Sequence, residues 1–201
     1  MGGGAEAEME ELEKILESTL ETDEKLLWKS GAEPFDTLDV TYKSNFVIKT
    51  VIAAIVAVGL TVLYLVMIGG FNEYFKPLIV LIFFGFAAIA PLNVIADAKR
   101  LRKAIYAATD RRLILVRDSV RSMEYYAIKE AAFRADEAGH VSLLCGKDAL
   151  AAKPHKWREM AVVGQGAMDG GDLCKCFVFY APEKAGELKA ILKEKIPGLQ
   201  G

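Results

Sequence analysis

The chain has 201 residues, of which 53% are hydrophobic and 26% are charged, and its formal net charge is -2. The hydrophobic share exceeds the ~45–50% of a typical soluble domain, so a purely soluble globule is disfavoured. The small net charge hides two opposite parts, because residues 1–24 hold nine acids and one base, which leaves 18 acids and 24 bases in the rest. Since these bases are not gathered among aromatic residues, we expect no nucleic-acid partner.

The first predicted element is an amphipathic helix over residues 6–20. Its apolar residues recur every three or four positions and its other face is strongly acidic; they are Met9, Leu12, Ile15, Leu16 and Leu20. The heptad pattern lasts barely two repeats, which is too short to assign a coiled coil. The helix therefore either docks on its own domain or binds a partner or a second copy, and the sequence leaves both open.

Two uncharged runs of 19 residues follow, at 50–68 and 77–95. A helix of this length rises about 28 Å, close to the ~30 Å thickness of a hydrocarbon core. The link at 69–76 is too short to hold a domain, so we expect an antiparallel hairpin of spans at 46–68 and 77–96. An acidic stretch precedes the first span, and a small-residue cleavage site is missing, so we expect a retained anchor rather than a signal peptide.

The orientation of this hairpin follows from lysine and arginine near the span ends. The only basic residue of the link is Lys76, whereas several basic residues follow the second span and others flank the first span. We therefore expect a multi-pass protein of the cell membrane with both termini cytoplasmic. Each base near an anionic leaflet contributes about 1 kcal/mol, which makes this cluster the candidate for headgroup contact. Its members are Lys99, Arg100, Arg102, Lys103, Arg111 and Arg112.

Short runs rich in β-branched and aromatic residues, separated by polar turns, fill the chain after the second span. We expect antiparallel strands at 105–109, 112–117, 120–126, 131–136, 141–145, 160–163 and 175–180. A helix then starts at Pro182 and runs to Ile196, with Pro197 and Gly198 as its stop signal. The predicted fold class is α+β: a two-helix transmembrane hairpin plus a small antiparallel β-barrel or sandwich capped by a C-terminal helix.

Three stretches of the sequence resemble the bacterial pleckstrin-homology-like (PH-like) membrane proteins. Residues 24–34 are similar to the family's opening E-x-L-L-W-x-x-G-x-x-P, residues 106–114 to its Y-x-x-T-x-x-R hairpin, and residues 122–128 to its third strand. The resemblance implies a PH-like fold on a membrane hairpin. The expected organisation is an acidic helix at 1–23, a cytoplasmic segment at 24–45, the spans and their external loop at 46–68, 69–76 and 77–96, and a cytoplasmic PH-like domain at 97–201.

The resemblance also bears on ligand binding. Eukaryotic PH domains bind phosphoinositides through basic residues around the first hairpin, and Arg111, Arg112, Arg117 and Arg121 lie in or near comparable turns here. Arg112, however, matches a position that looks structural in the family. A fold of this kind does not by itself fix a function.

The sequence offers little material for catalysis. Residues 162–171 superficially resemble a dinucleotide-binding turn, but Asp169 stands where the third glycine of G-x-G-x-x-G belongs, so we expect a flexible loop. Cys174 and Cys176 lack the spacing of common metal-binding pairs, and we expect them and Cys145 to be reduced thiols. Without a nucleophile or carboxylate-pair signature, we expect no enzyme activity, no cofactor and no metal site.

Two functions remain in play at this point. In the first, the chain is a membrane-anchored interaction or scaffolding module that binds a protein partner or assembles with itself. In the second, it binds lipid headgroups or serves as an accessory subunit of a membrane transporter or an envelope-stress system. Both include membrane lipids as partners.

Overall fold

The computed structural model of the protein describes residues 3–71, 73–163 and 176–200. The chain divides into two compact units, residues 37–96 and residues 1–36 together with 97–201. We call the first the helical unit and the second the β unit. The predicted α+β class, with two long apolar helices and antiparallel sheets, is confirmed.

The helical unit consists of α2 (Val40–Ile68) and most of α3 (Pro77–Leu101). Both helices are long and apolar enough to cross a membrane. Large apolar side chains cover their surface; Met67 is 78% exposed and Phe86 is 70% exposed. Contiguous apolar surface of this kind is unfavourable in water and suits a hydrocarbon environment. The link between the helices falls at 69–76 as expected, but their other ends run past the predicted spans, to Val40 and Leu101.

Local hydrogen bonds explain where α2 begins and ends. The Asp39 carboxylate accepts hydrogen bonds from the backbone N–H groups of Thr41 at 3.1 Å and Tyr42 at 3.2 Å, so the helix starts ahead of the apolar run. Its C-terminal cap is Gly69, whose φ of 77° is strained for residues that carry a Cβ.

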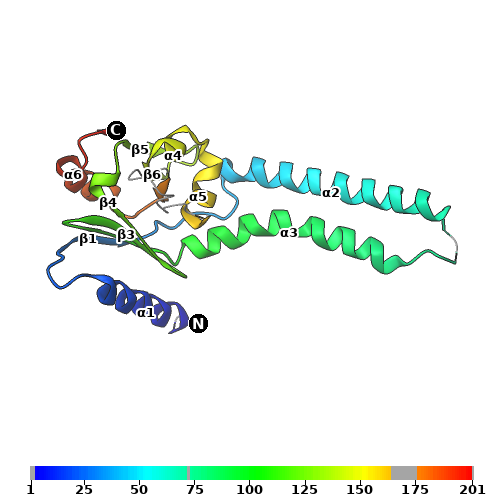
Figure 1. Ribbon diagram of the computed structural model, residues 1–201, viewed down its shortest axis with the longest axis horizontal. Helices are drawn as coiled ribbons and strands as arrows, with labels where there is room; N and C mark the ends of the chain where they lie inside the picture. Colours follow the sequence, from blue (N-terminus) through cyan, green and yellow to red (C-terminus); the bar gives the residue numbers. More distant parts are fainter. Residues whose placement is uncertain (1–2, 72, 164–175, 201) are drawn as a thin grey trace. The chain divides into compact units, whose positions relative to one another are not determined.

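The β unit contains two four-stranded sheets (Figure 1). The first is antiparallel and follows chain order: β1 (Leu26–Gly31), β2 (Ile105–Thr109), β3 (Arg112–Val116) and β4 (Val120–Glu124). Strand β1 lies in the stretch expected as a connecting segment at 24–45. It was missed because its partner β2 comes only after both long helices, so no turn signal marks the pair.

The second sheet has the order β7 (Phe177–Phe179), β6 (Val141–Cys145), β5 (Ala131–Ala135) and β8 (Leu199–Gln200). Its pairs are antiparallel apart from β5 and β8, which are parallel. A bridge between Ala32 and Pro182 joins the chain after β1 to the chain after β7. The described strands nevertheless form two separate sheets, so closure into a barrel is not seen.

Between β6 and β7 the chain is helical where it is described. It forms α4 (Lys147–Ala151), the 3-10 turn η2 (Pro154–Lys156) and α5 (Trp157–Val163). The strand expected at 160–163 is therefore wrong, because an apolar run that short fits a buried helical turn equally well. The expected strand at 120–126 ends at Glu124, and Tyr125–Ala127 form the 3-10 turn η1. Strand β7 confirms part of the 175–180 prediction, and Lys175 lies outside the described residues.

The predicted closing helix is present as α6 (Ala185–Lys195). It begins later than expected because Pro182 takes part in the bridge to Ala32. Helix α6 buries Leu188 and Leu192 in the core between the sheets. Other members of this core are Tyr106, Leu113, Leu115, Phe133, Leu143, Phe177 and Phe179.

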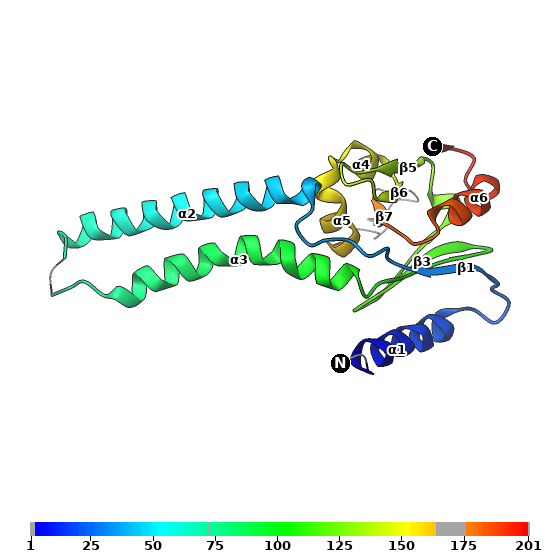
Figure 2. The same ribbon diagram turned by 180° about the vertical axis from the view of Figure 1, so that it is seen from behind.

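The remaining helix, α1 (Gly3–Thr19), covers the opposite face of the first sheet, as Figure 1 and Figure 2 show. Leu16 of α1 is buried at 1% exposure in a cluster with Ile105, Ala107, Ile114 and Val116. Side chains alternate along a strand, so these sheet residues point away from the core that α6 closes. The structure thus places the acidic helix on its own domain.

Candidate functional site

Several basic residues of the β unit lie at the two ends of β3. The turn between β2 and β3 carries Arg111 and Arg112, while the turn between β3 and β4 carries Arg117, with Arg121 just beyond it. Arg117 follows Arg112 by five positions along the strand, which is roughly 17 Å at ~3.3 Å per residue. The candidate lipid contacts do not form one patch, and each end of β3 has its own chemistry.

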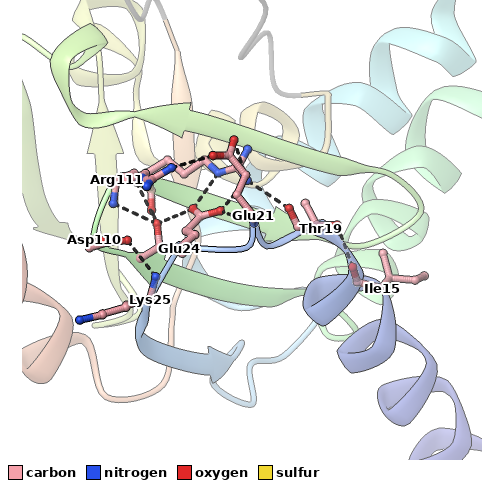
Figure 3. A network of polar contacts seen from close by, with 9 residues as sticks. Ile15, Thr19, Glu21, Glu24, Lys25, Asp110 and Arg111 are labelled. Carbon is pink, nitrogen blue, oxygen red and sulfur yellow. Dashed lines mark hydrogen bonds and ion pairs between the residues drawn. The ribbon is translucent and has the colours of Figure 1, made fainter.

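At the first end, Glu24 and Arg112 form a buried ion pair. Figure 3 shows Glu24 in this polar network, close to Glu21 and Arg111. One Glu24 oxygen accepts hydrogen bonds from the Thr109 hydroxyl at 2.7 Å and from Arg112 Nε at 2.8 Å, and the other accepts one from Arg112 Nη2 at 2.7 Å. The hydrogen bonds from Arg112 outweigh burial and lower the pKa of Glu24 from 4.5 to about 2. Both groups are therefore ionised at neutral pH.

Neighbouring contacts tie the chain after α1 to the same turn. Arg112 Nη2 also donates to the backbone carbonyl of Thr19, the last residue of α1, at 3.1 Å. Arg111 pairs with Glu21 at 2.7 Å, and the Lys25 N–H donates to the Asp110 carboxylate. These interactions give Arg112 a structural role in joining the chain after α1 to the β2–β3 turn, and they engage Arg111 in an ion pair within the chain.

The four basic residues at the end of α3 are all exposed: Lys99, Arg100, Arg102 and Lys103. Arg102 is drawn toward Phe35, donating from Nη2 to its carbonyl oxygen at 2.7 Å and lying 5.4 Å from its ring centroid. Arg100 instead contributes its charge to the second end of β3, where it acts on Arg117.

At this second end, Arg100, Arg117 and Arg121 form what we call the arginine cluster. The register pairs Val116 with Val120 and Leu115 with Arg121, which puts Arg121 on the core-facing side of the sheet. Arg117 Nη2 donates to the carbonyl of Val162 in α5 at 3.0 Å. Burial lowers the pKa of Arg117, and the charges of Arg121 and Arg100 lower it further, against the opposing effect of Asp118.

Several N–H groups of this cluster are buried and have no hydrogen-bond partner among the described residues: those at Nε and Nη1 of Arg117 and at Nη1 of Arg121. Asp118 lies near Arg117 Nε at 3.4 Å, but its side chain is 66% exposed. Sequence analysis placed Arg117 and Arg121 near a turn and Arg100 in the basic segment. It had no signal that would join them.

A second polar cluster links three elements of the β unit. The Tyr180 hydroxyl donates to Asp136 at 2.8 Å and accepts from Arg158 Nη2 at 3.0 Å. The Arg158 guanidinium also lies over the Phe35 ring at 4.3 Å. These groups hold α5 against the chain after β7, and sequence analysis missed them because no local motif connects them.

The glycine-rich stretch at 164–171 and Cys174, which were weighed as a dinucleotide turn and part of a metal pair, lie outside the described residues. The thiols of Cys145 and Cys176 are buried. Burial raises the pKa of the Cys176 thiol, which disfavours the reactive thiolate at neutral pH.

Comparisons of the chain with protein-family models, with curated proteins and with solved structures give no match. The PH-like resemblance therefore stays a prediction.

Proposed function

We propose that the chain is a membrane-anchored PH-like interaction module that binds a protein partner, or a second copy of itself, at the cytoplasmic face of the cell membrane. The pairing of β1 with β2 carries this proposal, because both apolar helices lie between these two strands in the sequence. The sheet is thus tethered twice, once through the chain that leads into α2 and once through the chain that leaves α3.

The order of the elements supports the PH-like part of the proposal. With β1 counted in place of the strand expected at 160–163, seven strands of the described chain precede the closing helix α6. The sequence pattern predicts this number of strands and a closing helix, and the resemblance implies that such a domain is PH-like.

Reporter fusions test the anchoring. A phosphatase fused at Gly70 is expected to be active, because it would lie outside, and a fluorescent protein fused at Gly201 is expected to fluoresce inside. Since β1 and β2 pair, an even number of crossings must separate them. An inactive phosphatase at Gly70, with Gly201 inside, would refute the hairpin topology.

Purification of the full chain from mild detergent tests the interaction. Self-assembly in a fixed ratio supports a scaffold, whereas a membrane protein that co-purifies in a fixed ratio supports the accessory-subunit alternative. A strict monomer with neither protein nor lipid bound would refute both.

A further inference from the structure

We propose that the arginine cluster of Arg100, Arg117 and Arg121 is a binding site for a phosphate group, supplied by a lipid headgroup or by free phosphate. Only the lipid source rests on the proposed function, because it requires the β unit to be held at a membrane. This site differs from the basic residues of the β2–β3 turn, where acidic partners within the chain engage both arginines.

The first argument is charge. The positive charges of Arg121 and Arg100 both act on Arg117 at this end of β3, and among the described residues the acid that opposes them is Asp118, whose side chain is largely in solvent. Like charges that lie close together in a partly buried place repel one another and disfavour each other's charged form. A bound dianion would attract the same guanidiniums and so offset this repulsion.

The second argument is hydrogen bonding. In the described part of the chain, Arg117 and Arg121 each bury N–H groups that have no hydrogen-bond partner, and a buried charged donor left unpaired is costly. The planar fork of a guanidinium matches the oxygens of a phosphate with two parallel hydrogen bonds. A tetrahedral oxyanion can therefore satisfy donors from more than one arginine at once.

The third argument is access. The Arg117 side chain is only 6% exposed and is held by the carbonyl of Val162, so it forms a fixed base for the site. Arg121 is half-buried and Arg100 is exposed, so these two long side chains can rotate to admit an anion. Arg100 also follows the end of the predicted span at residue 96 by four residues, about 6 Å of helix, a depth at which headgroups lie.

Calorimetry on the full chain tests the site, with inorganic phosphate as the probe at constant ionic strength. Dodecyl maltoside micelles are the host because they contain no phosphate. We expect saturable binding that is weakened about tenfold by Arg121→Gln and unchanged by Arg134→Gln. Arg134→Gln is the control because it also removes one positive charge, but from β5, where Arg134 donates a hydrogen bond to the carbonyl oxygen of Leu150. If Arg121→Gln does not fold, Arg100→Gln replaces it, because that side chain is exposed.

Addition of phosphatidylglycerol to the micelles separates the two sources. If phosphatidylglycerol competes with inorganic phosphate and weakens its binding, the site binds a lipid headgroup. If the binding of inorganic phosphate is unchanged, the site binds free phosphate. Absence of saturable binding in pure micelles, or equal weakening in the two variants, would overturn the site. Neither result affects the reporter fusions, so this proposal can fail while the anchoring stands.

Discussion

The ion pair between Glu24 and Arg112 should contribute strongly to the stability of the β unit. The variant Glu24→Gln keeps the shape of the side chain and removes its charge, leaving the half-buried Arg112 without its carboxylate. The Glu24 side chain is fully buried and the Arg112 side chain is 17% exposed, so solvent screens the pair only in part. The fall of its pKa from 4.5 to about 2 corresponds to about 3 kcal/mol. We expect the variant to lose about this much free energy of unfolding at pH 7.

The sign of the pH dependence follows from the same values. Because the pKa of Glu24 is lower in the folded chain than in the unfolded chain, its contribution is complete above pH 4.5 and is lost as the pH falls toward 2. The stabilities of the original chain and of Glu24→Gln should therefore converge over this interval.

Tryptophan fluorescence can follow this unfolding in the intact chain in detergent. The chain has two tryptophans, Trp28 and Trp157, and both belong to the β unit. Urea titrations of the original chain, Glu24→Gln and the exposed-site control Glu17→Gln would give the three free energies. The role of the pair would be refuted if Glu24→Gln lowered the free energy of unfolding by less than about 0.5 kcal/mol. It would also be refuted if the difference in free energy of unfolding between the original chain and Glu24→Gln were the same at pH 7 and pH 3.

Two further substitutions test the packing of the β unit by the same fluorescence assay. Leu16→Ala removes the buried anchor of α1, and we expect a loss of about 2–5 kcal/mol together with faster proteolysis between α1 and β1; unchanged proteolysis would contradict the docking. Gly198→Ala would place its Cβ 2.5 Å from the backbone oxygen of Lys129, so we expect a loss of about 1–3 kcal/mol. Gly186→Ala, whose Cβ meets no atom within 4 Å, is the control and should not destabilise α6.

The parts of the fold that follow from local pattern were predictable. The strands at 105–109 and 141–145 agree with the structure residue for residue, because β-branched and aromatic runs bounded by turns mark them. The apolar helices follow from length and the absence of charge. The strand expected at 160–163 failed because Ala161, Val162 and Val163 show no period in so short a run.

The candidate site was less accessible to prediction because its contacts join distant parts of the chain. Nothing near Glu24 in the sequence indicates that its partner is Arg112, because the segments of two long apolar helices separate these residues along the chain. In the same way, the charge of Arg100 acts on Arg117 only because the chain after α3 returns into the first sheet. Counting charges along the sequence identifies basic segments, but the tertiary structure decides which lysine and arginine side chains have acidic partners.

The pairing of β1 with β2, and the seat of α1 on the same sheet, also set an order of folding during synthesis. The first 36 residues leave the ribosome before both apolar helices, yet the sheet that receives them is complete only at Glu124. At ~5–20 residues per second this delay is roughly 4–18 s. Over that interval the apolar side of α1 has no sheet to cover, and the dense negative charge on its other face favours solubility of this exposed segment.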